Sequence, residues 1–143
     1  MLSSFLVLIA CGKTSEHVGH DIDGDNDSDS PNQALYNQVM DIHDEVMPKM
    51  EDIYKIKKDL LEEIANTPGM PAEQKKDLEN MISTLDSANN AMMDWMHHFN
   101  PKTDTTDEEA GREYLETEME RIKKVRDLTN ETLDKAKKLS GKN

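Results

Sequence analysis

Cysteine, aromatic residues and positive charge are all scarce in this chain of 143 residues. The one cysteine, Cys11, can form no disulfide within the chain, so the fold must be held together by packing. Aromatic residues make up 4% of the chain, so aliphatic side chains and methionine must supply most of the core. Lysine and arginine number 17 against 30 aspartates and glutamates, and the resulting net charge of −13 opposes binding to nucleic acid and to anionic lipid.

The sequence also lacks the short motifs that carry catalysis. It contains no phosphate-binding P-loop, no Gly-x-Ser-x-Gly turn and no His-Glu-x-x-His pair. Its carboxylates fall in mixed runs with lysine and arginine, such as residues 118–126, which are typical of solvated helix faces. We therefore expect a binding or structural protein and not an enzyme.

The longest apolar run lies at the N-terminus. Residues 2–10 are uncharged and too few to span a bilayer, which takes roughly 20 residues. Cys11 follows directly, between the small residues Ala10 and Gly12. This pattern is typical of a bacterial lipoprotein, with residues 1–10 as the signal peptide and Cys11 as the lipidated N-terminus of the mature protein.

No lysine or arginine precedes the apolar run, which leaves the true start codon open. Two or more acyl chains on Cys11 would hold the protein firmly on a membrane. We therefore expect an extracytoplasmic protein, anchored by lipid at the outer membrane or the cell surface.

The rest of the chain divides into an acidic tether and one helical domain. Residues 11–30 are rich in Asp, Gly and Ser and nearly free of apolar side chains, so we expect a flexible tether. In residues 31–143, apolar residues recur at steps of three and four, which predicts helices and no strands. The first begins at Pro31 and stops at Asn66–Gly69, the second runs from about Pro71 to about residue 100, and the third from about residue 107 to 139.

Short connections between three long helices predict an all-α, antiparallel, coiled-coil-like bundle. We expect the first helix to be kinked at Pro48, which removes one backbone hydrogen bond. The residues expected to face inward are Leu35, Val39, Ile42, Val46, Met50, Ile53, Leu60, Ile64, Leu78, Met81, Leu85, Ala88, Met92, Trp95 or Met96, Phe99, Leu115, Met119, Ile122, Val125, Thr129, Thr132 or Leu133, Ala136 and Leu139. The end of the bundle away from the tether is expected to contain Leu61 and Leu128 as well.

Methionine and histidine gather at the end nearest the tether. An antiparallel hairpin places position 43 roughly opposite position 94, which brings the first half of helix one beside the last turns of helix two. Thioether sulfur is a soft ligand and imidazole a borderline one, so together they suit Cu(I) or Ag(I). The predicted metal ligands are some of Met40, His43, Met47, Met93, Met96 and His97.

Two other interpretations of this cluster stay open. Methionine often fills irregular gaps in a core, and a stripe at helical spacing is usually core. A Met-lined groove could instead bind a partner helix or an apolar ligand. Haem fits less well, because no Cys-x-x-Cys-His motif is present and three helices enclose a haem less readily than four.

Two Met-rich blocks, His43–Met50 and Met92–His97, resemble a family of uncharacterised bacterial envelope lipoproteins. Some members carry the label "viral A-type inclusion protein". The resemblance covers most of residues 35–139, including Tyr114–Glu116 and Ile122–Val125. It implies a helical cell-envelope protein and supplies no catalytic residues.

Overall fold

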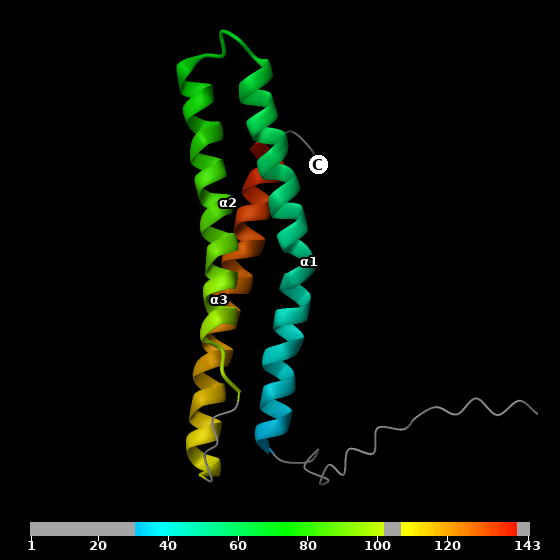
Figure 1. Ribbon diagram of the computed structural model, residues 1–143, viewed down its shortest axis with the longest axis vertical. Helices are drawn as coiled ribbons and strands as arrows, with labels where there is room; N and C mark the ends of the chain where they lie inside the picture. The colour runs from blue at the N-terminus through cyan, green and yellow to red at the C-terminus, as the bar shows by residue number, and fades with distance from the viewer. Residues whose placement is uncertain (1–30, 102–106, 140–143) are drawn as a thin grey trace, which may run out of the picture.

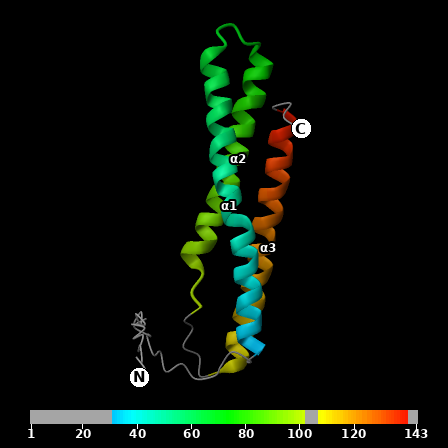
Figure 2. The ribbon, with the colours of Figure 1, turned by 90° about the vertical axis from the view of Figure 1, so that its right-hand side faces the viewer.

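A computed structural model describes residues 31–101 and 107–139 as three helices. Helix α1 spans Pro31–Asn66, α2 spans Ala72–His98 and α3 spans Glu108–Leu139. The three run alongside one another, and the α1–α2 hairpin reaches beyond the C-terminal end of α3 (Figure 1, Figure 2). The predicted all-α bundle is therefore confirmed, with no strand in the described ranges.

The helix boundaries follow local sequence signals. Pro31 is the first residue of α1, where a missing N–H costs nothing. The turn after α1 uses Gly69, whose φ of 91° suits a residue without a side chain, and the Met70 N–H bonds the Thr67 carbonyl at 3.2 Å. Before α3, the Asp107 carboxylate accepts hydrogen bonds from the Glu109 and Ala110 N–H groups, so Asp107 is the N-cap.

Two apolar clusters form the core. On α1 the fully buried residues recur every seven positions, at Val39, Val46, Ile53 and Leu60, which is the spacing of a coiled-coil seam. The first cluster lies near the start of α1 and contains Val39, Val46, Met92, Trp95, Met119, Ile122 and Val125. The second lies nearer the α1–α2 turn and contains Ile53, Leu60, Leu78, Leu85, Ala88, Leu133 and Ala136. Thr129 and Thr132, expected to face inward, are buried as well.

Three predicted core leucines are exposed. Leu61, Leu128 and Leu139 keep 48%, 38% and 41% of their surface. Leu61 and Leu128 each stand one position from a fully buried residue, and one position turns a side chain by about 100° around the helix. Leu139 is the last residue of α3.

The described helices do not test the predicted lipoprotein N-terminus, the tether or the kink at Pro48. The signal peptide, Cys11 and the tether lie outside the described residues. Helix α1 continues through Pro48, and the kink expected there stays a prediction. None of the described helices has an apolar stretch of a length that would cross a membrane.

Candidate functional site

The candidate site lies at the open end of the bundle, where α1 begins and α2 ends. On α1, Met40, His43 and Met47 follow one another at steps of three and four, so they share one face of the helix. Met40 and His43 are half-buried and Met47 is 37% exposed. This face therefore carries two thioethers and one imidazole next to solvent.

The His43 ring is held by its neighbour. Its Nδ1 lies 2.8 Å from the Asp44 Oδ1, and the His43 side chain is 20% exposed. A carboxylate at this distance favours the tautomer that donates Nδ1–H, which leaves the lone pair of Nε2 available as an acceptor or ligand. Asp44 thus orients the one imidazole of α1.

The expected register of the hairpin is confirmed at this end. The ring centroids of His43 and Trp95 are 5.9 Å apart, so position 43 faces the last turns of α2. In those turns Met96 packs against the first core cluster, whereas Met93 is 41% exposed and His97 is exposed. His43 is thus in contact with Trp95 of α2. Met93 and His97 each stand two positions from Trp95, about 160° around the helix, so they face away from this contact.

Most of the other methionines at this end fill the core. Met92 is fully buried and Met119 is 7% exposed, and Met50 packs against the same cluster. For these three, core packing explains the residue type. Among the described methionines, Met47 and Met93 are the exposed ones.

The sequence did not predict the aromatic cluster at the open end of the bundle. Phe99 stacks on Trp95 with ring centroids 4.7 Å apart, and it also contacts Tyr36 at 6.2 Å and Tyr114 at 6.3 Å. The scarce aromatic residues are thus concentrated at the candidate site. The only signal was that each falls near the tether end of its helix, which matters once the helices are known to be antiparallel.

Two polar atoms at this end of the bundle are the Tyr114 hydroxyl and the Trp95 Nε1. The Tyr114 hydroxyl accepts a hydrogen bond from the Asn100 N–H at 2.7 Å, and burial raises the pKa of Tyr114 above its ordinary value. The Trp95 Nε1–H is buried and has no hydrogen-bond partner among the described residues. An indole N–H without a partner weakens the packing of an otherwise apolar ring.

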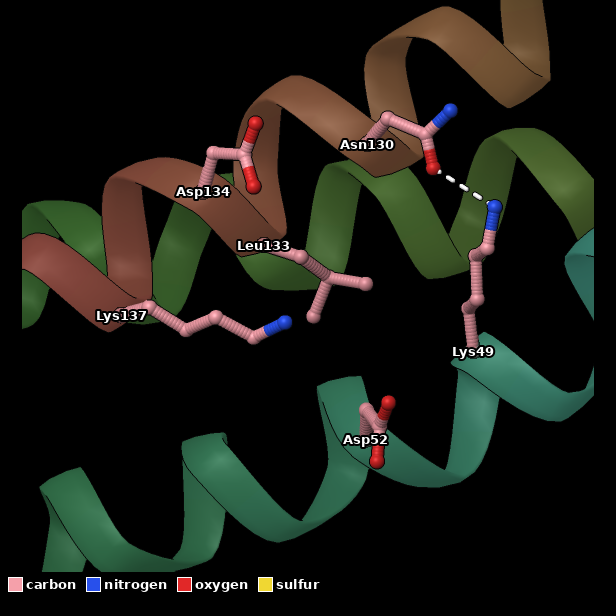
Figure 3. A pocket seen from close by; sticks show the side chains of 6 residues that line it. All are labelled: Lys49, Asp52, Asn130, Leu133, Asp134 and Lys137. Atoms are coloured by element: carbon pink, nitrogen blue, oxygen red, sulfur yellow. Dashed lines mark hydrogen bonds between the residues drawn. The ribbon is translucent and has the colours of Figure 1, made fainter. Parts of the chain in front are cut away.

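A polar cavity of about 350 Å³ lies on another side of α1, between α1 and α3. Its lining residues are Lys49, Asp52, Asn130, Leu133, Asp134 and Lys137 (Figure 3). The Lys49 ammonium donates to the Asn130 amide oxygen at 2.8 Å and to the Glu45 carboxylate at 2.7 Å. None of the six predicted metal ligands lines this cavity, so it is separate from the candidate site.

Within residues 31–101 and 107–139, no three His, Cys, Asp or Glu side chains form a group that could hold a metal ion. A metal at the open end would therefore need methionine sulfur among its ligands.

No family model matches the chain, and comparisons with curated proteins and with solved structures found no match. The resemblance to envelope lipoproteins stays a prediction.

Proposed function

We propose that this protein is a cell-envelope binding protein, anchored by lipid on Cys11, that holds a soft monovalent metal ion such as Cu(I) at the open end of its bundle. The ligands would come from Met40, His43 and Met47 on α1 and from Met93, Met96 and His97 on α2. The observation that carries the proposal is the contact of the His43 Nδ1 with Asp44, because a carboxylate partner is the usual orienting group of a metal-binding histidine.

The solvent exposure of the thioethers is consistent with this role. Met47 and Met93 keep 37% and 41% of their surface, so a ligand could contact these side chains without opening the core. The fully or nearly fully buried methionines, Met92 and Met119, are outside the proposed ligand set, whereas Met96 packs against the same cluster and belongs to it. Soft sulfur ligands favour Cu(I) over Mg²⁺ or Ca²⁺, which prefer oxygen.

Cu(I) titration of the full chain in detergent, under reducing conditions and against a competing chromophoric chelator, tests the metal site. His43→Gln and the pair Met40→Leu/Met47→Leu should each weaken binding, since each removes ligands and keeps the side-chain volume. Asp44→Asn should weaken it by about 10–100-fold, because the orienting carboxylate is lost. Met81→Leu, at the other end of the bundle, is the matched control and should bind as the parent does.

The metal proposal fails if the ligand variants bind Cu(I) as tightly as Met81→Leu does. In that case the exposed Met47 and Met93 would favour the second candidate function, a Met-lined surface for a partner helix or an apolar ligand. Metabolic labelling with a fatty acid tests the anchor separately. Label should appear on the parent and disappear in Cys11→Ser, and an unlabelled parent would refute the anchor.

A further inference from the structure

Helix α1 carries a line of exposed apolar side chains outside the two core clusters. Met47, Tyr54 and Leu61 keep 37%, 71% and 48% of their surface. They are seven positions apart, which is close to two helical turns, so all three point in nearly the same direction. Single exposed apolar residues are ordinary on a protein surface, but a line of three over about 20 Å of one helix is typical of a contact surface.

We propose that this line, the α1 stripe of Met47, Tyr54 and Leu61, is the contact between two copies of the chain packed antiparallel around a two-fold axis near Tyr54. The spacing of the stripe is self-complementary. Met47 and Leu61 lie equally far from Tyr54 in opposite directions, so an antiparallel copy places Met47 against its Leu61 and the two Tyr54 rings near the axis. Such a closed, symmetric contact is the commonest way in which identical chains pair.

The charges beside the stripe favour the antiparallel arrangement. Glu51 and Lys58 are both exposed. At about 100° per residue, their side chains point roughly 60° and 40° away from Tyr54 around the helix axis, and both lie on the same flank of the stripe. In an antiparallel pair, the same flanks of the two helices meet, and Glu51 comes level with Lys58 of the second copy. A parallel pair would hold them about 10 Å apart along the axis, where they could not bond.

Neither charge makes a strong bond to another of the described residues. Lys58 lies 3.7 Å from Glu62, and both side chains are more than half exposed, so this pair contributes little and can give way. Two other lysines of this part of α1 are already paired, Lys49 with Glu45 and Lys57 with Asp86, so the charge complementarity of the contact depends on Glu51 and Lys58.

A contact along one helix is small, so the dimer should be weak and reversible, with a dissociation constant on the order of micromolar or above. Sedimentation of the full chain over a range of concentrations should show a mass that rises from 16.3 kDa toward twice that value. Tyr54→Glu places two carboxylates near the axis and should keep the chain monomeric. Tyr54 is 71% exposed, so the substitution leaves the fold intact, which circular dichroism checks.

Leu128→Glu is the matched control, because Leu128 is an apolar residue of similar exposure to Met47 on a different helix. It should associate as the parent does, and this comparison also removes any association caused by the apolar N-terminal run. A parent that stays monomeric at all concentrations, or a Tyr54→Glu chain that associates like Leu128→Glu, would overturn the proposal.

A charge exchange tests the antiparallel geometry. Glu51→Lys and Lys58→Glu should each weaken association about tenfold, because each places like charges across the contact twice. The double variant Glu51→Lys/Lys58→Glu should recover the parent affinity, and so should a mixture of the two single variants. A double variant no better than the singles would show that the two residues do not meet, and would refute this arrangement. The stripe shares Met47 with the proposed metal site, but the variants at Tyr54, Glu51, Lys58 and Leu128 leave all six predicted ligands unchanged, so the two proposals fail separately.

Discussion

Replacing Glu118 by methionine should stabilise the bundle. Glu118 is 2% exposed on the core face of α3, and only its Oε1 is bonded, to the Arg121 guanidinium at 2.8 Å. Its Oε2 is buried and has no hydrogen-bond partner among the described residues. A buried acceptor without a partner costs about 1–3 kcal/mol, and more when the group is charged.

The magnitude follows from what the substitution removes. Arg121 is 41% exposed, so its guanidinium returns to water and the lost ion pair costs about 0–1 kcal/mol. Methionine has a similar length and helix propensity and buries an apolar chain at the same position. We expect a net gain in the free energy of unfolding of about 1–3 kcal/mol, which corresponds to roughly 4 °C in Tm for each kcal/mol in a domain of this size.

Urea and thermal unfolding followed by circular dichroism measure this gain. Glu120→Met is the control, because Glu120 lies on the same helix but its side chain is 67% exposed, and its effect should stay within about 0.5 kcal/mol. If Glu118→Met is no more stable than Glu120→Met, the unpaired oxygen carries no penalty and the reasoning is wrong.

Four further substitutions test the core, a helix cap and the half-buried Tyr114 hydroxyl. Leu85→Ala should lower the free energy of unfolding by roughly 2–5 kcal/mol, because Leu85 is fully buried. Met93→Ala should lower it by about 1 kcal/mol or less, because Met93 is 41% exposed. Urea unfolding measures both losses, and equal losses would contradict the burial of Leu85. Asp107→Ala should cost about 1 kcal/mol, since it removes the N-cap of α3, and an unchanged urea midpoint would argue against that cap. Tyr114 should ionise above the ordinary tyrosine pKa of about 10, so its contribution to stability is present below that pH and is lost as the pH rises through its higher folded pKa. In an absorbance titration, Tyr114→Phe should remove the tyrosine that ionises at the highest pH, and loss of an earlier one would refute this assignment.

The fold could be predicted closely because its signals are local. Pro31 begins α1, Pro68 and Gly69 follow its end, and apolar spacing of three and four marks each helix. The antiparallel register also followed from the short turn, and the contact of His43 with Trp95 agrees with it. These features depend on residues near one another in the chain, so no knowledge of packing was needed.

The candidate site was predicted only in outline. The sequence located a Met-rich and His-containing end, but it could not say which thioethers face the core. Met92 is fully buried while its neighbour Met93 is 41% exposed, although both are methionines in the same turn. Which of two adjacent side chains faces inward depends on how α2 is rotated against α1 and α3.

Local sequence is enough to place three long helices and their approximate ends, because helix formation is governed by neighbours a few positions apart. It also places methionine and histidine at one end of the bundle. The burial of Glu118, the meeting of the four aromatic rings and the exposure of the α1 stripe could be found only in the folded bundle. They depend on how the packed helices are rotated against one another, which is set by the fit of side chains from distant parts of the chain.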